Sequence, residues 1–363
     1  MGCVDRRRRP SLKDVAHLAQ TSIATASRAI SGAGYVAEET RARILDAARN
    51  LNYQPNLRAR GLRQRFSRSI GLIIPNLLNA YYTALADAAA QQLTASGYHL
   101  LLSSTRDDPS AEHDVLYDMV GQAVDGLIWV PTNPDAELMG YLMSQHTPLV
   151  AIVRRLRDDP VDTVVFEDLA GSLAAMQHLI SLGHQRVAYI GGDVMFSSNH
   201  DRWQGYLNAL REAGITPDDA LVKLGTNRSM WGTMAMNDLL RLASPPTAIF
   251  VASNAIMPGV IRTLRQVSVR LPEEMSLICF DDVDWFSFSV PPITAINTPY
   301  TKLAEAAVDL LLARIGQGDG LERPPVFMEI SFELMLRRST APPRRGPLTL
   351  QESQAEGAAQ KVG

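Results

Sequence analysis

Hydroxyl side chains and an arginine recur on one short stretch near the start of the chain. In TSIATASRAI, Ser22, Thr25, Ser27 and Arg28 are separated by small apolar residues. A guanidinium group can donate a fork of hydrogen bonds to a guanine edge, and hydroxyl groups can bond to phosphates or bases. This set predicts a surface that contacts nucleic acid, although an alanine-rich helix by itself is also typical of simple packing.

The distribution of charge favours the same kind of partner. The 363 residues have a formal net charge of -3, but the segment through Arg68 holds thirteen arginines and Lys13 against five acidic residues. It therefore carries +9 and the remainder carries -12. Cations clustered near phosphates release condensed counterions. Taken alone, the run of four arginines at 6–9 is more typical of a solvated basic tail, and it is the segment after it that favours nucleic acid.

Two short helices are predicted to position the polar set. Ser11 and Asp14 have the spacing of a capping box, which starts a helix over 12–19. Ser22 can cap a second helix over 23–30. Two short helices joined by a tight turn form a helix-turn-helix, whose second helix can enter the major groove of DNA.

The small residues of the second helix have a predicted role of their own. Ala26 and Ala29 let the two helices approach closely and leave an outer face slim enough for the groove. A third helix is expected in the segment AEETRARILDAARNLNY, with a buried stripe of Ile44, Leu45, Ala48 and Leu51. The basic segment that follows is either a marginal helix that folds against a partner or a plain linker.

From Ser69 onward, apolar runs alternate with amphipathic helices, as in βαβ units of a parallel sheet. A single sheet can hold these runs, but the length of the segment favours two doubly wound subdomains with a cleft between them. The predicted buried strands are 69–76, 99–105, 125–131, 148–153, 186–192, 248–253 and 275–282, with helices such as 82–97 and 169–183 between them.

The stretch LKDVAHLAQTSIATASRAISGAGYVAEETRARILDAARNLNYQPNLRARGLR resembles the DNA-binding head and hinge of the LacI/GalR repressor family. The resemblance implies that Ile23, Ala24 and Arg28 read bases and that Leu62 wedges into the minor groove at the centre of the DNA site. It places Ser22, Thr25, Ser27, Tyr53 and Asn56 near the DNA backbone, and we add Ser11 to the candidate DNA contacts. Among the departures, Gln20 stands where the family commonly has glycine.

The resemblance extends over about residues 11–343, through segments such as HLISLGHQRVAYIGG, FDDVDW and ELMLRRSTAPP. It implies a body of two doubly wound parallel-sheet subdomains of the periplasmic-binding-protein-like type, with the chain crossing between them near Phe166, Thr298 and Val326. The expected domains are a basic arm (1–10), a helix-turn-helix (11–54), a hinge (55–68), an effector-binding domain (69–340) and a disordered tail (341–363). The two subdomains are expected at 69–166 with 298–325, and at 167–297 with 326–340.

The same resemblance implies the residues of an effector site in the cleft. These candidates are Tyr81, Tyr82, Arg202, Trp231, Ser253, Asn254 and Asp281, and Arg154 beside the first crossing can add a cation. Aromatic rings can stack on the apolar face of a polar ring, while Arg202 and Asp281 can hold hydroxyl groups or a carboxylate. The family often has Asn-Asp where this chain has Ser253 and Asn254, so its ligand cannot be copied from a relative.

The sequence disfavours two other classes of function. Enzyme activity is disfavoured because the sequence contains no GxGxxG, GxSxG, GxxxxGK[ST] or HExxH motif. A periplasmic sugar-binding protein would use the same body, but the basic head and the lack of an apolar signal segment argue against secretion. Cys3 and Cys279 cannot form a disulfide framework or a CxxC site, so we expect no metal, no cofactor and a cytoplasmic, nucleoid-associated location.

The sequence therefore predicts a ligand-regulated transcriptional regulator, a repressor rather than an enzyme. It should bind a pseudo-palindromic operator as a homodimer, or as a tetramer, and respond to a small polar metabolite such as a sugar. Whether this effector is an inducer or a corepressor stays open, as does its identity.

Overall fold

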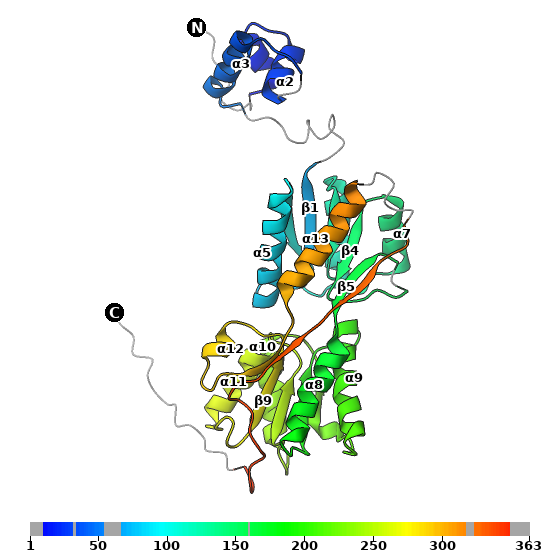
Figure 1. Ribbon diagram of the computed structural model, residues 1–363, viewed down its shortest axis with the longest axis vertical. Helices are drawn as coiled ribbons and strands as arrows, with labels where there is room; N and C mark the ends of the chain where they lie inside the picture. Colours follow the sequence, from blue (N-terminus) through cyan, green and yellow to red (C-terminus); the bar gives the residue numbers. More distant parts are fainter. Residues whose placement is uncertain (1–9, 32–33, 54–66, 159, 317–322, 349–363) are drawn as a thin grey trace, which may run out of the picture. The chain divides into compact units, whose positions relative to one another are not determined.

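The computed structural model describes residues 10–31, 34–53, 67–158, 160–316 and 323–348. These residues belong to two compact units that divide between Ser67 and Arg68. The first unit is helical, and the second is an α/β body with two six-stranded sheets (Figure 1). The predicted fold class, a helix-turn-helix head with a body of two parallel-sheet subdomains, is confirmed.

The head contains α1 (Leu12–Leu18), α2 (Ile23–Ser31) and α3 (Glu38–Asn50). The predicted capping box starts α1: the Ser11 amide donates to the Asp14 carboxylate at 2.7 Å, and the Asp14 amide donates to the Ser11 hydroxyl at 3.4 Å. Both bonds satisfy amides at the helix start that have no partner within the helix.

The core of the head is built from alanines and a few larger residues. Ala26 and Ala29 are almost fully buried, as the close packing of α1 and α2 requires. On α3, Ile44 and Ala47 face the core, whereas Leu45 is 40% exposed, so the prediction that Leu45 is buried is wrong. Only a narrow stripe of α3 is covered, because two short helices cannot surround it.

Gln20 occupies a backbone conformation that favours glycine. It has a φ of 53° and follows α1, where its amide donates to the His17 carbonyl while the Thr21 amide donates to the Ala16 carbonyl. These two bonds define a Schellman motif, in which the residue after the helix cap is left-handed and is usually glycine. Asn52 has the same position after α3 with a φ of 51°, and asparagine tolerates this region better.

We expect Gln20→Gly to stabilise the head by about 0.5–1 kcal/mol, because the side chain is strained at positive φ. Hydrogen exchange of the α1 and α2 amides in the full-length protein measures this local free energy of opening. Asn52→Gly is the matched control and should change protection less. Protection in Gln20→Gly equal to or lower than that of the wild type would refute the strain assigned to Gln20.

The body has two lobes, each defined by one sheet. The sheet of the first lobe has the strand order β11-β5-β4-β3-β1-β2, and that of the second lobe has β12-β10-β9-β8-β6-β7. The strands of the first lobe are β1 (Ser69–Ile74), β2 (His99–Ser104), β3 (Gly126–Trp129), β4 (Leu149–Ile152), β5 (Asp162–Phe166) and β11 (Phe327–Ile330). The strands of the second lobe are β6 (Val187–Gly191), β7 (Val222–Leu224), β8 (Ala248–Val251), β9 (Ser276–Phe280), β10 (Thr294–Asn297) and β12 (Glu333–Met335).

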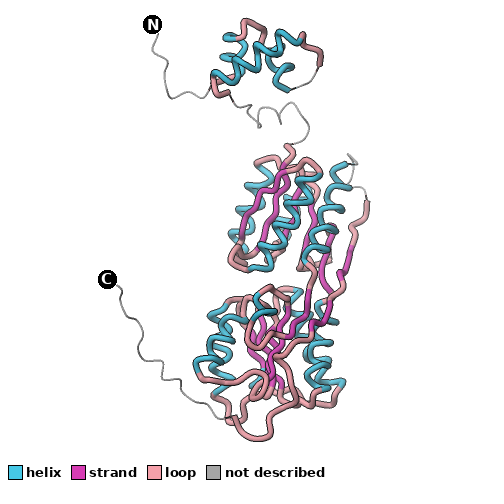
Figure 2. The backbone as a smooth tube through the Cα atoms, turned by 60° about the vertical axis from the view of Figure 1, so that its left-hand side comes forward, coloured by secondary structure: helices cyan, strands magenta, loops and turns pink. Residues whose placement is uncertain are grey.

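Helices cover both faces of each sheet, as Figure 2 shows for the body. The first lobe has α5 (Ala80–Ala95) and α13 (Tyr300–Gly316) on one face, and α6 (Pro109–Gly121) and α7 (Ala136–Ser144) on the other. The second lobe has α10 (Ser229–Leu240) and α11 (Met257–Gln266) opposite α8 (Asp168–Ser181) and α9 (Ser197–Glu212). The short η1 (Asp219–Leu221) and α12 (Trp285–Phe288) complete the second lobe.

One predicted buried strand is not buried. β2 is the edge strand of its sheet, and Leu102 on it is 42% exposed. The apolar run at 99–102 indicated a strand but not its place in the sheet, because an edge position depends on pairing with distant segments.

The chain crosses between the lobes after β5, after β10 and once more near its end. The third crossing was predicted near Val326, and this is wrong, because β11 still belongs to the first lobe and pairs with β5 in parallel. The crossing follows Ile330, as the red segment in Figure 1 shows. The Val326 amide donates to the Asp162 carboxylate at 2.8 Å and so holds the start of β11 beside β5.

The predicted disordered tail begins too early. Residues 341–348 are described, and Arg344 donates to the carbonyls of Glu274 at 2.8 Å and Pro246 at 3.1 Å. Nε2 of the buried His184 donates to the Ala341 carbonyl at 2.9 Å, and its Nδ1 lies 2.8 Å from the Thr247 hydroxyl. These contacts fix 341–344 on the second lobe, while the rest of the predicted tail, from 349, lies outside the described residues.

Burial lowers the pKa of His184, which is neutral in this site. Because the unfolded chain binds a proton more readily, His184 stabilises the fold above about pH 6.5, and this contribution is lost as the pH falls toward the lower pKa of the folded state. We expect His184→Gln to flatten the loss of stability between pH 6.5 and 5, by up to about 1.4 kcal/mol per pH unit. Denaturant unfolding at several pH values measures the slope. His99→Gln, on the exposed edge strand, should keep the wild-type slope, and an unchanged slope in His184→Gln would contradict the assignment.

Candidate functional site

The exposed face of α2 carries the polar set that the sequence predicted. Ile23 is 47% exposed, and Ala24 and Arg28 are also exposed. The Ser22 hydroxyl accepts from the Thr25 amide at 3.1 Å and lies 2.8 Å from the Thr25 hydroxyl, so it caps the helix as predicted. Thr25 and Ser27 are half-buried. The outer surface of α2 is therefore slim and carries one cation at its exposed side.

The other candidate contacts of the head have different surroundings. Ser11 is engaged in the capping box, and Tyr53 is half-buried against the head core, where burial raises its pKa. Asn56 and Leu62 lie outside the described residues. Tyr35, an aromatic residue among small and polar neighbours between α2 and α3, is 92% exposed.

A cavity of about 1000 Å³ lies between the two lobes of the body. Strands of both sheets direct their carboxyl ends toward it, which is where open α/β sheets place ligands. Seven of the eight predicted effector contacts line it: Tyr81, Tyr82, Arg154, Arg202, Ser253, Asn254 and Asp281.

Four lining positions have left-handed backbone conformations. Arg106 and Asp107, in the loop after β2, have φ values of 58° and 59°. Val153 has a φ of 66° directly after β4, and Asp281 has a φ of 65° directly after β9. Such conformations are costly for branched residues and concentrate at functional sites. At Val153 the chain turns tightly, with the Arg154 amide donating to the Ile152 carbonyl at 2.7 Å. The turn places Arg154 at the rim of the sheet, on the cavity.

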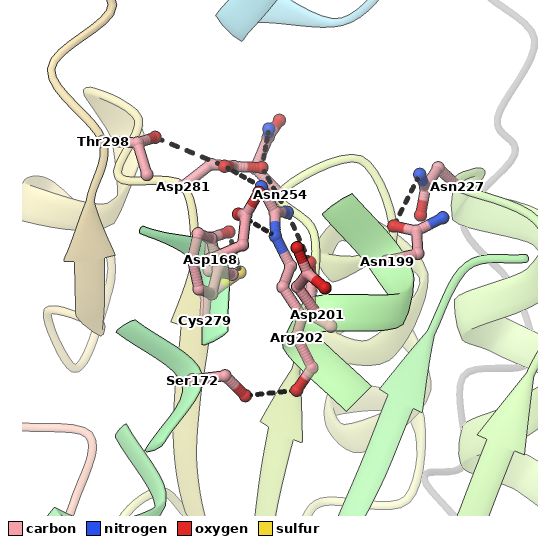
Figure 3. A network of polar contacts seen from close by, with 12 residues as sticks. Asp168, Ser172, Asn199, Asp201, Arg202, Asn227, Asn254, Cys279, Asp281 and Thr298 are labelled. Atoms are coloured by element: carbon pink, nitrogen blue, oxygen red, sulfur yellow. Dashed lines mark hydrogen bonds and ion pairs between the residues drawn. The ribbon is translucent and has the colours of Figure 1, made fainter. Parts of the chain in front are cut away.

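Arg202 is the centre of a buried network (Figure 3). Its Nε donates to Asp168 at 2.8 Å, its Nη2 to Asp281 at 3.3 Å and its Nη1 to the Ala252 carbonyl at 2.8 Å. Its guanidinium carbon lies 3.8 Å from the centroid of the Phe280 ring. Asp281 also accepts from Asn254 at 3.2 Å and from Thr298 at 3.3 Å. Arg202 thus joins α8, α9 and the ends of β8 and β9.

Burial dominates the electrostatics of this network. It raises the pKa of Asp168 to about 7, although the Arg202 charge acts in the opposite direction. Burial also disfavours the charge on Arg202, but Asp168 and Asp281 outweigh it and raise the pKa of that guanidinium. Arg202 is therefore a permanent cation that two aspartates hold in the floor of the cavity.

The first lobe contributes a second arginine and two tyrosines. Arg154 is 3% exposed; its Nη2 lies 2.8 Å from Asp107, and its guanidinium carbon lies 3.8 Å from the Phe196 ring centroid. Burial raises the pKa of Tyr82 to about 12, so its hydroxyl keeps its proton at neutral pH. Within the described part of the chain, neither Arg154 Nε nor the Tyr81 hydroxyl has a hydrogen-bond partner.

Trp231 is the exception among the predicted effector contacts. It does not line the cavity; its Nε1 donates to the Gly191 carbonyl at 3.1 Å, and its ring covers Gly225. Trp285 of α12 lines the cavity instead, together with the paired amides Asn199 and Asn227. Trp285 lies in the segment FDDVDW, which is part of the family resemblance, but only the fold shows which aromatic side chain lines the cavity.

A basic helix-turn-helix unit and a two-lobed body around a polar cavity define a DNA-binding regulator with a small-molecule site. Two family models match the chain: bacterial regulatory proteins of the lacI family over residues 11–56, and a periplasmic binding protein-like domain over residues 176–340. The chain belongs to the lacI family of bacterial transcriptional regulators.

Relatives match along most of the chain. The HTH-type transcriptional repressor PurR of Actinobacillus pleuropneumoniae serotype 3 (strain JL03) is 32% identical over 91% of this chain and 98% of its own length. A lac repressor dimer bound to operator and the anti-inducer ONPF is 25% identical, with a TM-score of 0.79 over 92% of this chain and all of that one. A complex of the transcriptional regulator CelR with cellobiose is 29% identical, with a TM-score of 0.68 over 91% of this chain and all of that one.

The relatives are transcriptional regulators, and this chain is not an enzyme. The described residues contain no group of His, Cys, Asp or Glu side chains able to hold a metal ion. Across the same residues, every helix is too short or too polar to span a membrane.

Proposed function

We propose that the protein is a repressor that binds a pseudo-palindromic operator as a homodimer or tetramer and is controlled by a sugar or sugar derivative. Its DNA contacts would be Ile23, Ala24 and Arg28 in the major groove, with Leu62 at the central minor-groove step. Ser11, Ser22, Thr25, Ser27, Tyr53 and Asn56 would contact the DNA backbone. The repressor works in the bacterial cytoplasm, on the nucleoid.

The operator half of the proposal rests on the outer face of α2. This face presents an arginine and small side chains on a helix about 10 Å wide, which suits the major groove. The lac repressor structure is a dimer on operator DNA, and twofold pairing of this chain would place two copies of α2 in successive grooves.

The effector half rests on one observation, the composition of the cavity. Tyr82 and Trp285 offer ring faces, while Ser253, Asn254 and Asn199 offer hydroxyl and amide groups. Aromatic faces with convergent polar groups suit a polyhydroxylated ring, which has apolar faces and polar edges. The relative CelR binds a sugar, cellobiose.

The proposed switch is a change in the opening of the two lobes. A ligand that contacts both lobes favours one degree of opening, because it can only shift the equilibrium by binding one state more tightly. DNA must in turn change ligand affinity by the same factor by which ligand changes DNA affinity.

Selection of duplexes from a random DNA library by the purified protein tests the operator half. An enriched palindrome with a central pyrimidine–purine step, lost in Leu62→Ala, is the expected outcome. No enrichment, both alone and with metabolite extracts, would refute the repressor function. The selected duplex then serves as the probe for screening sugars.

A further inference from the structure

We propose that the effector is an anion, a polyhydroxylated compound with a carboxylate or phosphate group that Arg106 of the first lobe and Arg228 of the second lobe bind together. This inference rests on the proposed function, because it specifies the ligand of the same cavity.

The charges that line the cavity are unbalanced. Four arginines line it, Arg106, Arg154, Arg202 and Arg228, against two aspartates, Asp107 and Asp281. Arg202 is already shared between Asp168 and Asp281, and Arg154 pairs with Asp107. No acidic group within the described part of the chain forms an ion pair with Arg106 or Arg228, and both side chains are exposed. Two cations are therefore left for a ligand.

Helix starts add to the positive potential. The first turns of α9 and α10 line the cavity through Ser198, Asn199 and Ser229, and the N-cap residues Phe196 and Arg228 provide no side-chain cap. Uncapped amides at a helix start favour negative charge, each by a modest amount. The two arginines without an ion-pair partner in the described residues make the stronger case, and the helix starts act in the same direction.

The positions of the two arginines also suggest how the anion controls closure. Arg106 follows β2 in the first lobe, and Arg228 precedes α10 in the second. Like charges on opposite lobes repel each other as the lobes approach, and an anion between them removes this repulsion. A neutral sugar leaves the repulsion in place. The charged ligand therefore has the greater differential affinity for the closed state, which a switch requires.

Thermal unfolding of the full-length protein at constant ionic strength tests the proposal with glucose, gluconate, glucose 6-phosphate and inorganic phosphate as probes. At least one of the three anions should raise Tm at concentrations where glucose does not, since binding to the folded state stabilises it. Gluconate and glucose 6-phosphate distinguish a carboxylate from a phosphate. Titration calorimetry of the stabilising anion should show binding about tenfold or more weaker in Arg106→Gln and in Arg228→Gln.

Arg241→Gln is the matched control. It removes the same charge from the other end of α10, where Arg241 is 80% exposed and lies outside the cavity. This variant should bind the anion as the wild type does.

Three results would each overturn the proposal that the effector is an anion. Glucose could stabilise the protein as strongly as its charged derivatives, none of the anions could stabilise it, or Arg228→Gln could bind the anion as tightly as Arg241→Gln does. The proposed function stands or fails separately. If the protein selects an operator and releases it when a neutral sugar binds, the proposed function holds and only the anion is wrong. If the protein selects no operator, the proposed function itself is wrong.

Discussion

Arg202→Met should destabilise the body by about 3–5 kcal/mol, the usual cost of removing one partner from a buried ion pair. The variant leaves Asp168 and Asp281 buried without their cation and also loses the bond to the Ala252 carbonyl. Denaturant unfolding of the full-length protein measures the change. Any variant that still folds should lose its response to the effector, because the floor of the cavity is disrupted.

The pH dependence of this variant separates lost charge pairing from lost packing. Burial already raises the pKa of Asp168 to about 7, and without Arg202 this pKa rises further. An acid whose pKa is raised on folding stabilises the fold at low pH and loses this contribution as the pH rises through the folded value. The loss in free energy of unfolding caused by Arg202→Met should therefore be smaller at pH 6 than at pH 9. A loss independent of pH would mean that the variant lost packing alone.

Arg241→Gln is a control for the loss of an exposed arginine from the same lobe, where the expected change is within about 0.5 kcal/mol. Adding Asp168→Asn to Arg202→Met should recover part of the stability, since it removes one unpaired buried charge. No recovery would contradict the assignment of the cost to Asp168.

Arg28→Ala should weaken operator binding by about 1–3 kcal/mol and abolish the preference at one base position. Arg28 is exposed on α2 beside Ala24, and its guanidinium group can reach a guanine edge if α2 lies in the major groove. Binding of the selected duplex and of its single-base variants measures both effects.

Arg43→Ala removes the same charge from an exposed position on α3. It should weaken binding to all duplexes alike and leave base preference intact, because a distant arginine acts only through the field of the head. If Arg28→Ala also kept the wild-type preference at every position, Arg28 would not read a base.

Much of the head was predictable because its signals are local. Ser11 and Asp14 form their capping box within a single turn, and Ala26 and Ala29 face the core because helical periodicity places them there. Leu45 shows the limit, since periodicity gives the apolar side of α3 but not how much of it two short neighbours cover.

The composition of the cavity was predictable only in part. The sequence, through its resemblance to a family, identified seven lining residues, four of them after the ends of strands and three on α5 and α9. It could not indicate that Asp168 shares Arg202, because the carboxylate and the guanidinium lie 34 positions apart on two packed helices. It also selected Trp231 in place of Trp285. Both tryptophans lie at helix starts, and only the packing of α10 and α12 determines which of them lines the cavity.

By itself, therefore, the sequence determined what depends on neighbours along the chain: the helix starts, most of the strands, the basic head and the class of protein. The tertiary structure alone decided that β11 pairs with β5, that the chain crosses after Ile330, and that Arg106 and Arg228 line one cavity without an acidic partner in the described residues. The physical reason is that strand pairing and charge compensation are set by contacts between segments far apart in sequence, which no local pattern encodes.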